Sequence, residues 1–487
     1  MNRKQVLSIR NGQAFPVSDR PLLPVDHFRR WVVEAVADAN RLAALWASET
    51  DGRHILTAVV AADAQGLLHV VTTAIEREFP SLTPDCPQAE RFEREIHEQW
   101  GLIPVGHPWL KPVRVLPQAA DFYAMAGDEI HEVAVGPVHA GIIEPGHFRF
   151  QCHGETVYHL EIALGYQHRG VERAMVGGPH LRSIHYMETL AGDTSIGHAL
   201  AHCQAIEAIS QMPVPARAQV LRGVALELER VANHVGDLGA LAGDIGFLPT
   251  MSYCSRIRGD VLNLTATLCG NRFGRGLVRP GGVGFDVDLP TVNEMKRRVG
   301  IVLKDTQSAV ELLWNSPSVM ARFDQTGALT RPVCNEIGLV GVAARACGAA
   351  RDVRSDHPFG IYRFAQIPVS TWHTGDVFAR AYVRWLEIQR SLAFIDEQLD
   401  SLPDGPVLAS SGSIRPDYSV VSLVEGWCGE ICHAATTDSR ARFQYYKVVD
   451  PSFHNWFGLA VALRNQQISD FPLCNKSFNL SYCGHDL

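Results

Sequence analysis

Residues 221–241 constrain the fold more than any other segment. Their sequence, LRGVALELERVANHVGDLGAL, repeats apolar residues at steps of three and four. An α-helix turns once every 3.6 residues, so this spacing places the apolar side chains on one continuous face. The members of that face are Leu221, Val224, Ala225, Leu228, Val231, Ala232, Val235 and Leu238. The segment therefore predicts a long amphipathic helix within a helical domain.

A second segment, from about Gly375 to Leu399, keeps the same period. Its apolar positions are Phe378, Tyr382, Trp385, Ile388, Leu392, Ile395 and Leu399. Thr374 is placed to cap the start of this helix, because a hydroxyl accepts the free N–H groups of a first turn. After about Ser411 the chain returns to short segments rich in glycine and β-branched residues, which indicate strands.

The residues before about 115 predict a small α+β unit. Residues 27–47, HFRRWVVEAVADANRLAALWA, form an amphipathic run that predicts an opening helix. Apolar runs at 54–60 and 67–73 flank Asp63-Ala64-Gln65-Gly66, which predicts a hairpin. A charged helix over residues 89–101 then ends at Gly101, a suitable C-cap.

The proline-spaced stretch from Pro104 to Pro117 marks the exit from that unit. A second hairpin follows, with strands at 148–152 and 157–163 and its turn at Gly154. A chain of 487 residues is too long for one ordinary core. We therefore predict an α+β protein with a small domain over residues 1–117. A mainly helical domain with β-rich ends is predicted over residues 118–487.

Charge and composition exclude several classes of protein. The net charge is −8, and no stripe of lysine or arginine interrupts it, so nucleic-acid binding is not expected. The N-terminus lacks the apolar region of a secretory signal, and no stretch approaches the ~20 apolar residues that span a bilayer. We expect a soluble chain in the cytoplasm, which can still dock onto a membrane partner.

Eleven cysteines are scattered along the chain, and no two are separated by only two residues. The usual spacings of zinc ribbons, ferredoxins and thioredoxins are therefore missing. We expect reduced thiols that pack as small buried side chains. Cys428 and Cys432 would point the same way on a strand. Two thiols make a weak metal site, so packing is the favoured interpretation.

Residues 92–111, FEREIHEQWGLIPVGHPWLK, resemble the signature of the 30 kDa subunit of respiratory complex I. The matching residues are Glu93, Arg94, Glu95, Glu98, Trp100, Gly101, Gly106, His107 and Pro108. Glu98 stands where the family usually has aspartate. Without the resemblance, the same stretch would indicate an ordinary charged helix followed by a Gly-Pro turn.

From Gly136 to its end, the chain resembles the large subunit of group 4 [NiFe] hydrogenases and the 49 kDa subunit of complex I. The resemblance is carried by GPVHAGIIEPGHF, HRGVERAM, ELERVANHVGDLG, RFGRGLVRPGGVG, VEGWCGEICH and YYKVVDPSFHNW. With the first domain it covers nearly the whole chain. A fusion of the two subunits in one polypeptide is characteristic of formate-hydrogenlyase-like and hydrogenase-4-like complexes.

The resemblance also implies four cysteine ligands for a nickel–iron centre, in two Cys-x-x-Cys pairs. The corresponding positions hold Ala191 and Thr194 in the first pair and Ser481 and Gly484 in the second. Cys483 lies next to the last position, but one thiolate cannot replace four. We therefore expect that this chain holds no nickel–iron centre and binds no cofactor of its own.

A quinone pocket of the complex I type is the second chemistry that the resemblance implies. Its histidine corresponds to His147, with His139 earlier in the same loop. Such a histidine can hydrogen-bond a quinone carbonyl and relay a proton near neutral pH. This chain departs from the family at two neighbouring positions. Gly192 stands at the pocket's tyrosine, and Cys428 stands where hydrogenases place an arginine over the metal.

Three further side chains are candidates for proton transfer. Glu172 matches the glutamate that passes protons in the hydrogenases, and Arg169 or Arg173 would tune its pKa. A structural ion pair is an equally good interpretation of Glu172. Asp193 and His198 lie in the loop that enters the next helix, where Asp193 also suits a helix N-cap.

The resemblance implies a hydrogenase-like subunit of a membrane-bound, ion-translocating oxidoreductase, peripheral on the inner face of the cell membrane. Its partners would be a small subunit with a [4Fe-4S] cluster and antiporter-like membrane subunits. Electrons would pass from NADH or another donor to a quinone or another acceptor. One alternative is a catalytically silent scaffold of the same complex. A working hydrogenase is the third alternative, and nickel analysis separates it from the other two.

Overall fold

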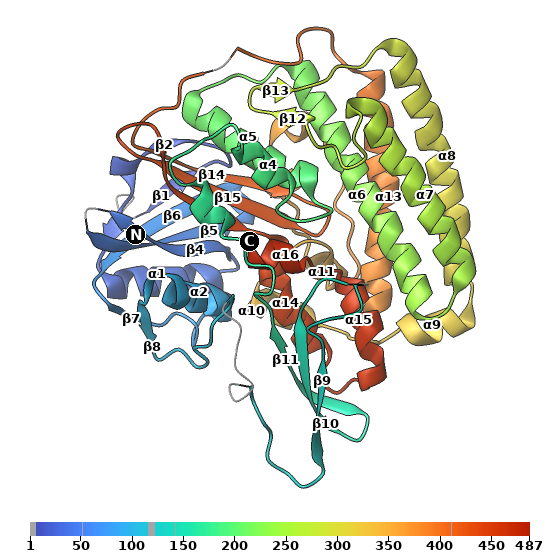
Figure 1. Ribbon diagram of the computed structural model, residues 1–487, viewed down its shortest axis with the longest axis horizontal. Helices are drawn as coiled ribbons and strands as arrows, with labels where there is room; N and C mark the ends of the chain where they lie inside the picture. The colour runs from blue at the N-terminus through green and yellow to red at the C-terminus, as the bar shows by residue number, and fades with distance from the viewer. Residues whose placement is uncertain (1–5, 51, 115–121, 142, 411) are drawn as a thin grey trace.

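The computed structural model describes residues 6–50, 52–114, 122–141, 143–410 and 412–487. Figure 1 shows a β-rich N-terminal region in blue and a bundle of long helices in green, yellow and orange. Between them lies a sheet from the C-terminal part of the chain. The predicted α+β architecture is confirmed. The predicted boundary between residues 117 and 118 lies outside the described residues.

An antiparallel sheet with two helices against it forms the N-terminal region. Its strands are β1 (Leu7–Ile9), β3 (Leu22–Leu23), β4 (Arg41–Thr50), β5 (Arg53–Ala62) and β6 (Leu67–Ile75), in the order β1-β6-β5-β4 with β3 parallel to β6. The helices are α1 (Val25–Ala37) and α2 (Glu90–Trp100), and a small parallel pair is β7 (Glu78–Pro80) with β8 (Ile103–Val105). The predicted hairpin around Gly66 and the C-cap at Gly101 are confirmed, since both glycines have φ near +65°.

The predicted opening helix over residues 27–47 is only half correct. The helix ends at Ala37, because Ala39 has a left-handed φ of 65° that turns the chain. Residues 41–50 then form β4. Eight of its ten residues are buried, so the strand carries no alternation of apolar and polar side chains. A strand covered on both faces cannot be distinguished from a buried helix by its periodicity.

The central sheet combines both ends of the chain. Strands β14 (Tyr418–Glu425), β15 (Glu430–Thr437) and β16 (Phe443–Val449) are antiparallel, as the C-terminal pattern predicts. The short strand β2 (Phe15–Pro16) adds to the edge of β14. Helices α14 (Pro451–Ala462), α15 (Phe471–Phe478) and α16 (Tyr482–Asp486) follow, and the sequence pattern does not predict them. Helix α14 is apolar on nearly every side, which hides its period.

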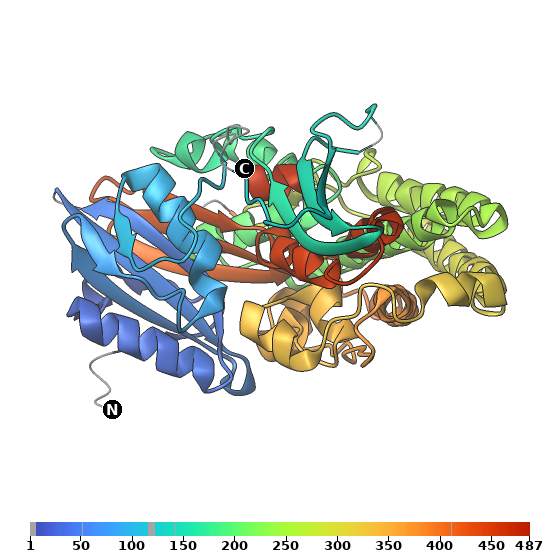
Figure 2. The same ribbon diagram turned by 90° about the horizontal axis from the view of Figure 1, so that it is seen from below.

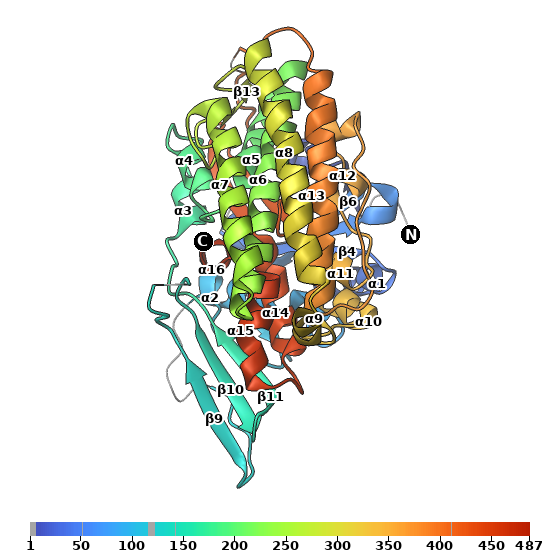
Figure 3. The ribbon, with the colours of Figure 1, turned by 90° about the vertical axis from the view of Figure 1, so that its right-hand side faces the viewer.

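Four long helices stand side by side in the bundle (Figure 3). They are α6 (Ala216–Asp244), α7 (Leu248–Cys269), α8 (Leu289–Trp314) and α13 (Val377–Asp400). The predicted helices over 221–241 and 375–399 are therefore confirmed. The predicted cap Thr374 is wrong. Asp376 accepts the Ala379 N–H at 2.8 Å, and the Thr374 hydroxyl donates to that carboxylate.

The remaining elements connect these bodies. A three-stranded sheet, β9 (Ile130–Val135), β10 (His147–His153) and β11 (Thr156–Ala163), confirms the second predicted hairpin and adds one strand to it. Figure 2 shows it beside the C-terminal helices, between the N-terminal region and the bundle. The shorter elements are α3 (Val171–Met175), α4 (Ser183–Glu188), α5 (Ser195–Ser210), β12 (Val278–Arg279), β13 (Gly282–Val283), α9 (Pro317–Phe323), α10 (Arg331–Ile337), α11 (Gly341–Ala346) and α12 (Val353–Asp356).

Two sequence expectations concern burial. All eleven cysteines lie in the described part of the chain, and each is buried with a free thiol, as predicted. Among the described helices, none has the length and apolar character needed to cross a bilayer.

Candidate functional site

Two segments that are far apart in sequence meet at the base of α5 and α16. One is the loop Ala191–Thr194, and the other is Ser481–Gly484. The Arg169 guanidinium joins them, because its Nη2 donates to the carbonyl oxygens of Leu190 at 2.6 Å and Cys483 at 3.2 Å. The four positions where the hydrogenases carry their metal ligands are therefore brought together in this fold.

The side chains at those four positions are engaged in other contacts. Thr194 accepts a 3.0 Å hydrogen bond from the Trp427 indole N–H, and the Ser481 hydroxyl accepts the Gly484 N–H at 2.9 Å. Ala191 is fully buried and offers only a methyl group. A Cβ at Gly484 would lie 2.7 Å from Asp450 Oδ2, so a carboxylate occupies the space beside this glycine.

Carboxyl groups surround the meeting point. Burial raises the pKa of Asp193 to about 7, and the nearby carboxyls of Asp237, Glu144 and Asp450 raise it further toward that value. The predicted N-cap role of Asp193 is wrong, because Glu229 from α6 accepts the N–H groups of Ile196 and Gly197 at 2.6 and 3.0 Å. Asp193 is half-buried and is left to titrate near neutral pH.

Two thiols lie at the same place. The Cys483 Sγ is 3.4 Å from the Ser481 hydroxyl, and burial with the nearby Glu144 carboxyl raises the pKa of Cys483 to about 12. Burial also holds the pKa of Cys428 well above its usual range. Both groups are therefore thiols and not thiolates at neutral pH.

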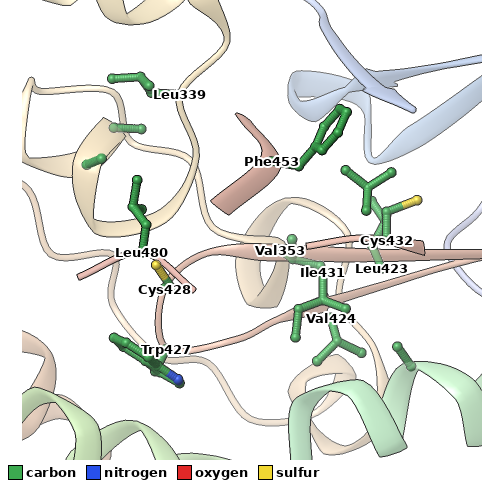
Figure 4. Packing of buried hydrophobic residues seen from close by; sticks show 14 of the residues in the cluster. Leu339, Val353, Leu423, Val424, Trp427, Cys428, Ile431, Cys432, Phe453 and Leu480 are labelled. Carbon is green, nitrogen blue, oxygen red and sulfur yellow. The ribbon is translucent and has the colours of Figure 1, made fainter. Parts of the chain in front are cut away.

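The expectation that Cys428 and Cys432 share one side of a strand is wrong. Cys428 lies in the turn between β14 and β15, which Gly426 and Gly429 close by two backbone hydrogen bonds. Cys432 lies within β15. Figure 4 shows Cys428 beside Trp427 and Leu480, and Cys432 away from them toward Leu423 and Phe453.

His139 and His147 close one loop from both ends. His139 Nε2 lies 2.8 Å from the Gly146 carbonyl, and His147 Nδ1 lies 3.3 Å from the Gly136 carbonyl. Burial lowers the pKa of His147, so it is neutral near pH 7. The same loop holds Glu144, whose carboxylate accepts the Tyr482 N–H at the start of α16. The loop therefore adjoins the meeting point through Glu144.

Glu172 lies in an ion network behind the C-terminal segment. Its carboxylate is 3.0 Å from Lys447 Nζ and accepts the Val448 N–H at 2.9 Å. Lys447 also contacts Glu95, which pairs with Arg114. The expected neighbours Arg169 and Arg173 are not its partners among the described residues.

His198 points from α5 toward the central sheet and is fully buried. Its Nε2 lies 3.0 Å from Asp450 Oδ2, and its Nδ1 lies 3.0 Å from His433 Nε2. Sequence reasoning missed Asp450, which precedes Pro451 and so shows only the pattern of a helix N-cap. Asp450 does cap α14 by accepting the Ser452 N–H, while its other oxygen faces the site.

Comparison with known proteins places these features in a family. Residues 31–124 match the model of the 30 kDa subunit of respiratory-chain NADH dehydrogenase, and residues 244–417 match that of its 49 kDa subunit. The chain is 31% identical to the carbon monoxide-induced hydrogenase of Rhodospirillum rubrum, over 72% of this chain and 97% of the relative. It is 28% identical to formate hydrogenlyase subunit 5 of Escherichia coli, over 85% of this chain and 78% of the relative.

The fold is also found in a solved structure. A chain of the membrane-bound sulfane sulfur reductase, an archaeal respiratory membrane complex, superposes with a TM-score of 0.70 at 22% identity. The match covers 75% of this chain and 100% of that one. The chain therefore belongs to the family of large subunits shared by complex I and the hydrogenase-4-like enzymes, with the 30 kDa and 49 kDa types fused in one polypeptide.

Proposed function

We propose that this chain is the large subunit of a membrane-bound respiratory oxidoreductase related to complex I. In this proposal, the site between α5 and α16 reduces an acceptor without a nickel–iron centre. A quinone is the candidate acceptor. Electrons reach it from a [4Fe-4S] cluster of a partner small subunit, and side chains of this chain supply the protons.

The observation that carries the proposal is the convergence of protonatable groups where the relatives place their metal. Asp193 has a pKa of about 7, so it can give and take a proton at physiological pH. The adjacent Gly192 is exposed, and a Cβ there would meet nothing within 4 Å. An acceptor therefore has open space directly beside a group that can protonate it.

The donor set does not fit a nickel–iron centre. Such a centre needs soft thiolate ligands, whereas the four positions offer a methyl, two hydroxyls and a bare backbone. Both hydroxyls already accept hydrogen bonds. The nearby thiols of Cys428 and Cys483 have raised pKa values, which oppose metal binding because the ligand must first lose its proton.

The relatives support the assembly. The printed names of relatives include formate hydrogenlyase, NADH-quinone oxidoreductase and a membrane-bound reductase complex. By analogy, this chain binds a small iron–sulfur subunit on the face where Gly192 is open, and antiporter-like membrane subunits lie below. This places it at the inner face of the cell membrane.

The test is the turnover of the assembled complex with a quinone analogue. Asp193→Asn is expected to lower kcat at least tenfold while subunit composition is unchanged. Asp260→Asn is the matched control, since Asp260 forms an exposed pair with Arg256 on α7. Equal loss in both variants would show a general effect and contradict the proposed role of Asp193.

The remaining candidates are tested in the same assay. His147→Ala and Glu172→Gln are expected to slow turnover if the loop histidine and the Lys447 network serve proton transfer. Unchanged rates in both would remove these two residues from the mechanism. An intact wild-type complex that reduces no acceptor would favour the silent scaffold.

A further inference from the structure

Five buried side chains are joined in a line beneath the candidate site. His198 lies 3.0 Å from Asp450 Oδ2 on one side and 3.0 Å from His433 on the other. The second nitrogen of His433, Nδ1, lies 2.9 Å from the Tyr446 hydroxyl, which lies 2.8 Å from Nδ1 of His202. None of the five is more than 2% exposed.

The fold builds this line from three elements. Helix α5 packs on the central sheet and carries His198 and His202 one turn apart, so both rings face the same side. His433 lies in β15 and Tyr446 in β16, where Tyr446 is paired with Ala435. Residues His433 and Ala435 are two apart in the strand, so His433 and Tyr446 are diagonal neighbours on one face.

The geometry fixes the direction of every donor. When Asp450 is ionised, His198 must donate to it from Nε2, which leaves Nδ1 to accept from His433. His433 Nδ1 must then accept from Tyr446, whose oxygen accepts from His202 Nδ1. The Nε2 of His202 is left as an acceptor, and no described residue hydrogen-bonds to it. All donors therefore point toward Asp450.

We propose that His202, Tyr446, His433, His198 and Asp450 form a proton relay that delivers protons to the candidate site. A proton binds His202 Nε2, and the Nδ1 proton of His202 moves to the Tyr446 oxygen. The hydroxyl proton of Tyr446 moves to His433 Nδ1. The Nε2 proton of His433 then moves to His198 Nδ1, and that of His198 moves to Asp450.

The step balances without leaving a charged histidine. One proton enters, the Asp450 carboxylate becomes a carboxylic acid, and each neutral ring changes tautomer. The relay resets when Asp450 passes its proton onward and the rings return to the first arrangement. The acceptor of that proton is the only part that rests on the proposed function.

The surroundings favour neutral rings. Burial lowers the pKa of His202 to about 3 and that of His433 well below its usual range, and it raises the pKa of Tyr446. At the other end, Asp450 is close to the Asp193 carboxyl and to Cys428. Asp193, with its pKa of about 7, is thus the nearest group that can take the proton into the open site.

The first test is the tautomer of each ring in the full chain labelled with ¹⁵N-histidine. At pH 8, His198 and His433 are expected to carry the proton on Nε2 and His202 to carry it on Nδ1. A broken pattern, such as His198 protonated on Nε2 with His433 protonated on Nδ1, would overturn the relay. This readout needs no partner subunit and no turnover.

The second test compares two adjacent tyrosines in the assembled complex. Tyr446→Phe removes the middle of the line, and kcat is expected to fall at least tenfold with the KM for the quinone analogue unchanged. Tyr445→Phe is the matched control, because the buried Tyr445 hydroxyl has no hydrogen-bond partner among the described residues. Its kcat is expected to stay within twofold of wild type.

The outcomes separate the two proposals. Equal kcat values for Tyr446→Phe and wild type would overturn the relay and leave the proposed function standing. A wild-type complex without turnover would contradict the proposed function, and the tautomer pattern would still decide whether the relay is formed.

Discussion

Lys447 in β16 donates to the carboxylate of Glu95 in α2 at 2.5 Å, across 352 positions of sequence. Both side chains are at most 3% exposed. Glu95 also pairs with Arg114, and Lys447 with Glu172. This buried network fastens the N-terminal helix to the central sheet directly behind the candidate site.

Replacing Lys447 by methionine is expected to destabilise the protein by about 3–5 kcal/mol, because Glu95 and Glu172 lose a buried counter-charge. Chemical denaturation measures the free energy of unfolding. Lys296→Met is the control, since Lys296 pairs with Asp396 and Asp400 at the surface. It is expected to have no measurable effect. A Lys447→Met variant as stable as the control would contradict the role of the network.

Acid is expected to weaken the bundle through Glu227. Two guanidinium groups, Arg230 and Arg354, and the hydroxyls of Ser391 and Tyr362 lower the pKa of this buried carboxyl from 4.5 to about 2. The folded state therefore gains stability above pH 4.5 and loses it as the pH falls toward 2. The contribution is about 3 kcal/mol.

The measurement is the free energy of unfolding against pH for wild type and Glu227→Gln. The variant is less stable at pH 7, and its curve is flatter between pH 5 and 2. Parallel curves over that range would show that Glu227 keeps an ordinary pKa when folded.

Asp193 is expected to affect stability in the opposite direction. Its pKa rises from 3.8 to about 7 on folding, so its stabilising effect is full below pH 3.8 and is lost as the pH rises to 7. Asp193→Asn should therefore stabilise the protein by about 2 kcal/mol at pH 8, less than the full shift implies because the side chain is half-buried. At pH 4 the two proteins should be nearly equal. Destabilisation at pH 8 would contradict the raised pKa.

The turn that carries Cys428 depends on a glycine in α11. Gly341 has φ +63°, and a Cβ there would lie 2.1 Å from the Cys428 carbonyl oxygen. Gly341→Ala is expected to cost more than about 3 kcal/mol from backbone strain and a displaced turn. Gly300→Ala, in the open interior of α8, is expected to stabilise by about 0.5–1 kcal/mol. Equal melting temperatures for the two variants would contradict the close approach.

The sequence predicts those parts of the fold that local patterns determine. Helices α6 and α13 are amphipathic over many turns, and Gly101 ends α2 with the φ that a C-cap requires. Strand β4 escapes prediction because both of its faces are buried, and α14 because it is apolar on nearly every side. In both cases tertiary burial removes the alternation on which the prediction depends.

The candidate site is predicted only in part for a similar reason. The family resemblance points to His198 and Asp193, which lie beside recognisable motifs. It does not point to His433, because only the packing of α5 on the sheet brings His433 within 3.0 Å of His198, 235 positions away. Asp450 shows the local pattern of a helix cap and fulfils that role, so its second contact leaves no local signal.

The central claim is that the place of the nickel–iron centre has become a metal-free acceptor site. Elemental analysis of nickel in the purified, assembled complex tests this most directly. We predict that nickel is far below one atom per copy of this chain, even when cells are grown with excess nickel. About one nickel per chain, retained through purification, would contradict the account.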